Sequence, residues 1–255
     1  MRLVLSLLLA LLFGGQVFAQ DVPAEGSTIK ERLVLGRSTF ALPPGDWHVV
    51  ATGTGDVLRE GTFVIGKTVS AYLVQLDDKG VFITGLWHRV PIATVTGISF
   101  WNESLCDNRH TLFYDAYSGR RNFPECLQIN HVVQFYVDAP ADAFERKIWT
   151  WFQTRKVKLP VTVLTAAYRN YFSGDYVRTS VSVNPEWFGQ DPAVKTIWAE
   201  SEWEPLTYDN DPRRKAFVEN LKKWSYVMAD NARATLRDRK PKAAMLPPLE
   251  DLRVK

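Results

Sequence analysis

The 255-residue sequence has only two cysteines and four histidines, and its 31 lysines and arginines nearly balance its 28 aspartates and glutamates. So few cysteines exclude a small scaffold held together by many disulfides, and the near balance of charge argues against a nucleic-acid-binding protein. No glycine-x-y period is present, and hydrophobic residues make up 46% of the chain. These proportions exclude a fibrous or disordered chain and predict a folded globular domain.

The sequence also lacks the motifs that identify common enzymes. It has no Gly-x-Ser-x-Gly elbow, no phosphate-binding loop, no dinucleotide-binding glycine pattern and no His-Glu-x-x-His pair. The run Asp209-Asn210-Asp211 lacks the following glycine and distal glutamate of a calcium loop, and is interpreted as a helix cap. We therefore predict no cofactor, and a non-catalytic protein is favoured over an enzyme.

An apolar segment stands at the start of the chain. Arg2 precedes the apolar run Leu3 to Phe13, and Val17-Phe18-Ala19 offers the residue types that signal peptidase reads. As a helix the run rises only about 16 Å, well short of the roughly 30 Å of a bilayer core, so it fits a signal peptide better than a retained anchor. We expect cleavage after Ala19, a periplasmic or secreted bacterial protein, and no transmembrane segment once the signal is removed.

The two cysteines fit an exported protein. Cys106 and Cys126 are an even number in an oxidising compartment and lie on either side of a polar, turn-rich segment. The pattern predicts a disulfide between them. A pair of reactive thiols is the alternative, which the same oxidising conditions disfavour.

Residues 30–138 predict a β-rich first part. Short apolar stretches recur about every 10 to 15 residues between turn signals, and Asp77-Asp78-Lys79-Gly80 is typical of a tight hairpin turn. This spacing favours an antiparallel sheet. The expected strands are Leu33–Leu35, Trp47–Ala51, Thr62–Ile65, Val69–Leu76, Val81–Leu86, Ala93–Trp101, His110–Tyr114 and Leu127–Val137.

Helical spacing begins near residue 139. Phe144, Ile148, Trp151 and Phe152 share one face of a helix that begins near Pro140. This apolar face predicts a helix packed on the sheet.

The next segment favours a second helix. Pro160 could open it, and four apolar residues then share one side. Two valines in its first turn weaken this interpretation. The shared residues are Leu164, Tyr168, Tyr171 and Phe172.

The elements after residue 176 have clearer sequence signals. Residues 177–183 alternate between apolar and polar, which predicts a half-buried strand. Asp191-Pro192 and Asp211-Pro212 each have the form of a helix cap followed by a first-turn proline. The second pair begins the longest expected helix, Pro212 to Arg237. Its expected buried stripe is Phe217, Leu221, Trp224 and Met228.

Together these patterns predict an α+β fold, in which a twisted antiparallel sheet carries several helices, concentrated in the C-terminal half. The expected organisation is a signal peptide over residues 1–19 and one domain over residues 20–240, β-rich to about residue 138 and helix-rich after it. Residues 241–255 are rich in lysine and proline, and we expect them to form a loose basic tail.

The segment between the cysteines offers a candidate binding site. Tyr114, Tyr117, Arg120 and Arg121 combine aromatic and guanidinium groups on a loop that the disulfide closes. Such groups suit protein, carbohydrate or anionic ligands. Ordinary loop solvation, with one tyrosine docked on the core, is the alternative.

A metal site is a second candidate in the same region. His110 and His131 lie just outside the two cysteines, so a disulfide would draw their strands together, with Asp107 or Asp115 as a third ligand. This arrangement supports the alternative function, an unrecognised hydrolase or metal-dependent enzyme near the disulfide loop. The other two histidines, His48 and His88, each follow a tryptophan in an expected strand and are interpreted as partly buried strand histidines.

Two segments carry a family resemblance. Phe40 to Trp47, with Leu-Pro-Pro-Gly-Asp between them, is similar to the opening of many exported bacterial proteins of unknown function. Val181 to Gly189, Trp198, Ser201 and Trp203 resemble the same uncharacterised family. The Pro-x-x-Trp form of the opening also resembles the PsbP/Mog1-like α+β fold. The resemblance implies no catalytic residues.

The expected export and the lack of a coherent catalytic set together predict the function. We expect a non-catalytic module that binds another protein or an envelope component.

Overall fold

The computed structural model describes residues 21–59, 63–94, 106, 111–118, 124–172 and 175–254. The predicted signal peptide lies outside these ranges. Within them, no helix has the length and apolar content needed to cross a membrane. The strands are β1 (Thr28–Ile29), β2 (Arg32–Leu35), β3 (Ser38–Ala41), β4 (Trp47–Arg59), β5 (Phe63–Leu76), β6 (Phe82–Thr94), β7 (Phe113–Ser118), β8 (Glu125–Val133), β9 (Thr162–Phe172) and β10 (Asp175–Val183). The helices are α1 (Ala143–Arg155) and α2 (Pro212–Asp238), with short 3-10 turns η1 (Trp198–Glu200), η2 (Tyr208–Asn210) and η3 (Leu249–Leu252).

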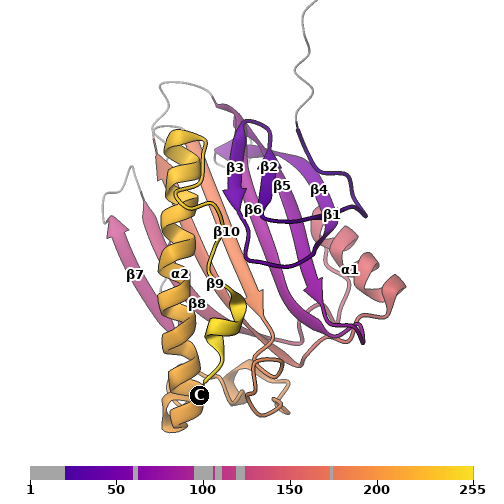
Figure 1. Ribbon diagram of the computed structural model, residues 1–255, viewed down its shortest axis with the longest axis vertical. Coiled ribbons are helices and arrows are strands. Elements are labelled where there is room, and N and C mark those ends of the chain that lie inside the picture. Colours follow the sequence, from indigo (N-terminus) through magenta and orange to yellow (C-terminus); the bar gives the residue numbers. More distant parts are fainter. Residues whose placement is uncertain are drawn as a thin grey trace, which may run out of the picture.

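Eight strands form one antiparallel sheet in the order β1-β4-β5-β6-β10-β9-β8-β7, and β2 and β3 form a separate hairpin (Figure 1). Two meanders, β4 to β6 and β7 to β10, are joined where β10 pairs with β6. The predicted antiparallel sheet is confirmed, and Asp77 closes the predicted turn by accepting hydrogen bonds from the Lys79 and Val81 amides. Two α-helices are present in the described ranges, fewer than the several that the sequence suggests.

The two helices cover opposite faces of the sheet. Successive strand residues point to opposite faces, so Leu73 belongs to the core under α2 whereas Tyr72 and Val74 belong to the core under α1. Figure 1 shows α2 lying along β8, β9 and β10, with α1 beside β4 at the other end of the sheet. Each face therefore has its own hydrophobic core.

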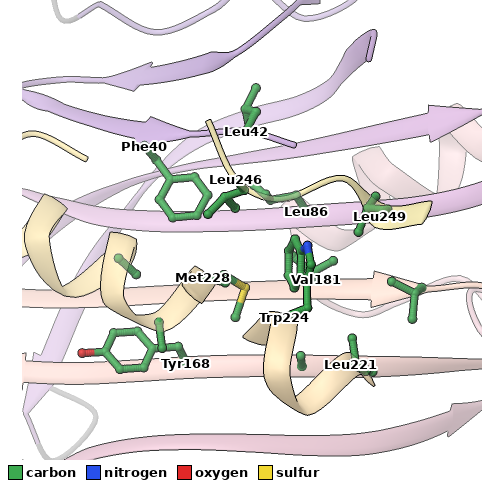
Figure 2. Close-up of a cluster of buried hydrophobic side chains, with 14 of the residues drawn as sticks. Phe40, Leu42, Leu86, Tyr168, Val181, Leu221, Trp224, Met228, Leu246 and Leu249 are labelled. Atoms are coloured by element: carbon green, nitrogen blue, oxygen red, sulfur yellow. The ribbon is translucent and has the colours of Figure 1, made fainter. Parts of the chain in front are cut away.

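Helix α2 forms as its sequence pattern predicts. The Asp211 carboxylate accepts hydrogen bonds from the Arg213 and Arg214 amides, and Pro212 occupies the first turn. Figure 2 shows Leu221, Trp224 and Met228 facing the sheet residues Leu86, Tyr168 and Val181. The predicted stripe Phe217, Leu221, Trp224 and Met228 is buried in full.

Helix α1 also follows its predicted face but begins later than Pro140. The Asp142 side chain accepts hydrogen bonds from the Phe144 and Glu145 amides and so fixes the first turn. Ile148 and Phe152 are buried against the sheet.

The helix predicted after Pro160 is wrong, because these residues form strand β9 in the middle of the sheet. Leu164 and Tyr168 face α2, whereas Val163 faces α1. Both faces of β9 are covered, so apolar residues occur at odd and even positions and no period of two is visible. The second part of the chain is thus less helical than expected, because β9 replaces one of its predicted helices, whereas β10 forms over the strand predicted at residues 177–183.

The C-terminal segment is packed and not loose, at least over residues 246–252. Leu246, Leu249 and Leu252 are 1%, 3% and 0% exposed, and the Leu246 amide donates to the Leu42 carbonyl. The Trp224 indole donates to the Pro247 carbonyl over 3.0 Å. Three buried leucines therefore pack this segment against the domain, although residues 241–255 have a basic composition.

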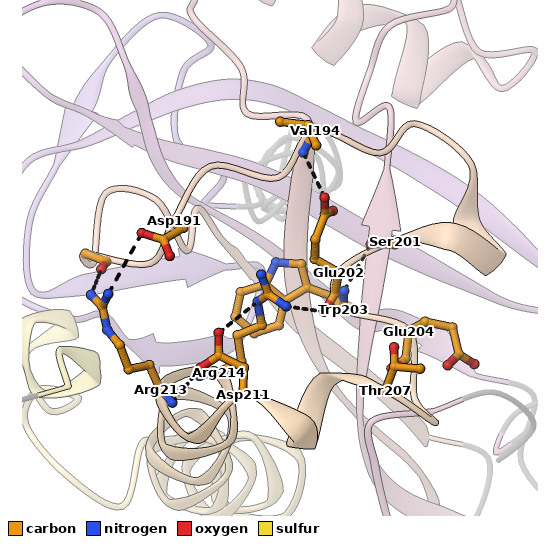
Figure 3. Close-up of polar contacts among 11 residues, drawn as sticks. Asp191, Val194, Ser201, Glu202, Trp203, Glu204, Thr207, Asp211, Arg213 and Arg214 are labelled. Atoms are coloured by element: carbon orange, nitrogen blue, oxygen red, sulfur yellow. Dashed lines mark hydrogen bonds and ion pairs between the residues drawn. The ribbon is translucent and has the colours of Figure 1, made fainter.

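The connection between β10 and α2 is held by polar contacts (Figure 3). Arg213 contacts Asp191 at 3.8 Å, and Arg214 donates to the Glu202 carbonyl and lies over the buried Trp203 ring. No α-helix begins at Asp191-Pro192, which corrects that part of the sequence interpretation, and residues 191–196 belong to neither a helix nor a strand. No apolar periodicity follows this proline, so a helix there would have no face to bury. Leu206 in the same connection is 84% exposed.

The predicted disulfide between Cys106 and Cys126 is confirmed, and it closes a separation of 20 residues. Cys126 is fully buried in β8. Replacing both cysteines by serine should lower the free energy of unfolding by about 3 kcal/mol, because the unfolded chain gains the entropy of the opened loop. Urea unfolding of the two proteins checks this value. An unchanged midpoint would contradict it.

Candidate functional site

The structure does not bring the predicted metal ligands together. Asp115 in β7 lies opposite Leu127 in β8, four residues from His131, a separation of about 13 Å along the strand. His131 stacks on Trp198 and its Nε2 is 3.2 Å from the Trp198 carbonyl oxygen. Asp115 accepts a hydrogen bond of 2.7 Å from Tyr226. His110 and Asp107 lie outside the described residues, and no three metal-binding side chains cluster within them.

Two of the four predicted binding residues, Tyr114 and Tyr117, lie in the described part of β7. Tyr117 packs edge-on against Tyr168 and Tyr226, with the Arg233 guanidinium 4.6 Å from its ring centre. It is therefore docked on the core under α2, as the alternative interpretation held. The Tyr114 hydroxyl is 3.4 Å from the Cys106 carbonyl oxygen. Arg120 and Arg121 lie outside the described residues.

A cavity lies on the other face of the sheet, beside α1. Its volume is about 370 Å³, within the usual range of small-molecule sites. Strand residues form its floor, and residues 134–138 with Glu145 of α1 form its cover. We call it the α1-side cavity. The floor residues are Tyr72, Trp87, Thr165, Arg178, Ser180 and Ser182.

The α1-side cavity gathers unpaired polar atoms. Ten buried side-chain polar atoms in the described part of the chain have no hydrogen-bond partner, and three of them belong to residues that line this one cavity. They are the Tyr72 hydroxyl, Trp87 Nε1 and Arg178 Nε. Two of these atoms are donors only, and the hydroxyl donates as well. A buried donor without a partner is unfavourable, so these three atoms are a local cost of the fold beside the cavity.

Packing holds the central ring of the floor in place. Trp87 lies between Phe144, whose ring centre is 5.4 Å away, and Arg178, whose guanidinium carbon is 4.7 Å from the Trp87 ring centre. Stacking on an aromatic face fixes the direction of a guanidinium group without neutralising its charge. Thr165 and Ser182 complete the floor with hydroxyl oxygens 2.8 Å apart.

Three arginines form a row on this same face. Arg89 in β6 pairs with Arg178 in β10, and Arg178 pairs with Arg169 in β9. Directly paired residues point to the same face, with their Cβ atoms about 5 Å apart. Arg89 and Arg178 form no ion pair with any residue that the structure describes. Arg89 instead donates from Nε to the Thr68 hydroxyl over 2.8 Å.

The charges of the three arginines act on one another and on a neighbouring tyrosine. Burial lowers the pKa of Arg169, and the charge of Arg178 lowers it further. Burial raises the pKa of Tyr176, and the charges of Arg178, Arg169 and Arg89 oppose that rise. This agrees with the strand pairing, which puts the three arginines on one face of the sheet.

This arrangement suits the recognition of a ligand. It offers positive charge and an aromatic ring beside the hydroxyl groups of Thr165, Ser180 and Ser182. These residues carry no sequence motif, so local patterns do not predict the site. The one local signal is the alternation around Arg178, which places that arginine among the polar residues of a half-buried strand.

No family model, curated protein or solved structure matches this chain. The resemblance to an exported bacterial family, and to the PsbP/Mog1-like fold, therefore stays a prediction. The function has to be argued from the site itself.

Proposed function

We propose that this chain is a non-catalytic binding protein, exported to the periplasm or secreted, which takes a small ligand into the α1-side cavity. The observation that carries the proposal is a cavity of about 370 Å³ whose floor places the Arg178 guanidinium over the Trp87 ring. The hydroxyl-bearing residues Thr165, Ser180 and Ser182 line the same floor. A charge, an aromatic ring and a few polar groups that converge on one cavity are typical of a small-molecule site.

The shape of the site supports the same proposal. The floor belongs to four adjacent strands of one sheet, β5, β6, β10 and β9, and is therefore preformed. Its cover comes from the segment before α1, where Val137 is 59% exposed. A ligand can thus enter past a short covering segment without opening the sheet.

The alternative of a hydrolase or metal-dependent enzyme near the disulfide finds less support. Its described ligands, His131 and Asp115, are engaged with Trp198 and Tyr226. No second function is proposed from that region.

Filling the cavity should abolish binding. Ser180 is 6% exposed on the cavity floor, and Ser180→Leu places an apolar side chain where the ligand would lie. We expect fragments that bind the wild-type chain in ligand-observed NMR, from a set of small aromatic acids, alcohols and amines, to lose their signal with this variant.

Thr150→Leu is the matched control. Thr150 is an exposed residue of α1 that lines a separate groove and not the α1-side cavity. Fragment signals should persist in this variant. Fragments that bind both variants equally, while circular dichroism shows both folded, would overturn the proposal.

A further inference from the structure

The arginine row has a direct energetic consequence for the ligand. Like charges directly opposite one another on neighbouring strands destabilise a sheet. Arg89 and Arg178 are such a pair, and Arg169 adds a third positive charge on the next strand. Within the described ranges no carboxylate pairs with Arg89 or Arg178. Negative charge placed beside this pair would relieve the repulsion.

The direction of Arg178 links the row to the cavity. Its guanidinium carbon lies 4.7 Å from the Trp87 ring centre, and both side chains line the α1-side cavity. One arginine of the row therefore brings a fixed positive charge to the floor, next to an aromatic ring.

The acidic residues of the cavity lie on the other side. Asp138 and Glu145 line it from the covering segment and from α1, and no carboxylate belongs to the strand residues of the floor. The cavity is thus polarised, with positive charge at the sheet and negative charge at the cover. An anionic group is attracted to the floor and repelled by the cover, which fixes its orientation.

We infer that the α1-side cavity binds a small organic oxyanion, a carboxylate or phosphate on an apolar body, with the anionic group at Arg178 and the apolar body against the aromatic residues. This inference rests on the proposed function and specifies its ligand. A charged acceptor makes the strongest hydrogen bonds with a guanidinium group, and the half-buried position of Arg178 limits screening by salt.

The test compares ligands of one shape and different charge. Benzoate, phenyl phosphate, benzyl alcohol and benzylamine are titrated into the full chain, and dissociation constants are measured by NMR and calorimetry. We expect at least one of the two anions to bind between about tenfold and a hundredfold more tightly than benzyl alcohol, the difference that a charge-assisted hydrogen bond provides. Benzoate and phenyl phosphate compared with each other identify which oxyanion is preferred.

Variants assign the preference to Arg178. Arg178→Gln should reduce the anion preference to less than about threefold, whereas Arg178→Lys keeps the charge but loses the stacked guanidinium plane and should keep only part of the preference. Arg155→Gln is the matched control, because Arg155 stacks on Trp151 at 4.8 Å in a similar manner but outside this cavity. It should leave the preference unchanged.

The outcomes separate the inference from the proposed function. If benzyl alcohol binds in the cavity as tightly as either anion, the cavity is a binding site and the oxyanion inference is overturned. If none of the four probes binds, both are overturned. An anion preference that survives in Arg178→Gln, with Ser180→Leu still blocking binding, would also overturn the inference, because another group would then hold the anion.

Discussion

Replacing Leu252 by alanine is expected to lower the free energy of unfolding by about 2–5 kcal/mol, although the residue lies in the C-terminal segment. Leu252 is 0% exposed, and Asn220 of α2 is 3.4 Å from its carbonyl oxygen. The substitution removes buried methyl groups and leaves a cavity beside α2, where neighbouring helix and strand residues cannot close in. Leu249→Ala should act similarly, and Figure 2 shows Leu249 in the same cluster as Leu86 and Trp224. Urea unfolding followed by circular dichroism measures both values.

The loss of unfolding free energy caused by such a substitution has an upper limit, which removal of the whole segment measures. A segment that is weakened enough detaches, so no single substitution in it can destabilise the protein by more than its docking free energy. Removing residues 245–255 should therefore destabilise the protein at least as much as Leu252→Ala. Leu206→Ala is the control, since Leu206 is 84% exposed and should change stability by less than about 0.5 kcal/mol. If Leu252→Ala behaves like Leu206→Ala, the C-terminal segment is loose, as its composition suggests.

The composition of residues 241–255 leads to a wrong prediction of a loose tail. Leu246, Leu249 and Leu252 recur every three residues, but the prolines and charged residues between them hide that spacing. Strand β9 misleads for the opposite reason, because both of its faces are buried and its apolar residues also fit a helical period. Helix α2 could be predicted closely, since its cap, its first-turn proline and its one-sided stripe agree with one another.

The candidate site could not be predicted from local pattern. Arg89 and Arg178 are far apart in the sequence and become neighbours only because β10 pairs with β6. Sequence proximity instead predicts a cluster of metal ligands near the disulfide. There, Asp115 and His131 share a face of the sheet but not a position along it. Strand order, which short-range patterns do not contain, decides which side chains meet.

A buried ion pair under α2 should show the largest effect of a single substitution. Arg233 Nε and Tyr168 Oη each lie 2.6 Å from Glu125 Oε1, and Glu125 is 9% exposed. Asn170 donates to the Tyr168 hydroxyl over 2.9 Å, which completes the network. Arg233→Met is expected to destabilise the protein by about 3–5 kcal/mol, because it leaves a buried carboxylate without its cation.

The double variant distinguishes this penalty from a loss of packing. Adding Glu125→Leu to Arg233→Met removes the stranded carboxylate, so the double variant should recover most of the stability that Arg233→Met loses. Glu125→Leu alone should be milder than Arg233→Met, because Arg233 keeps its contact with Asp230 at 2.9 Å and is partly exposed to water. Urea unfolding of the four proteins completes the cycle. Additive losses would show that the two residues are not coupled. Recovery in the double variant would show that this network stabilises the fold. The proposed binding site, the α1-side cavity, lies on the opposite face of the sheet.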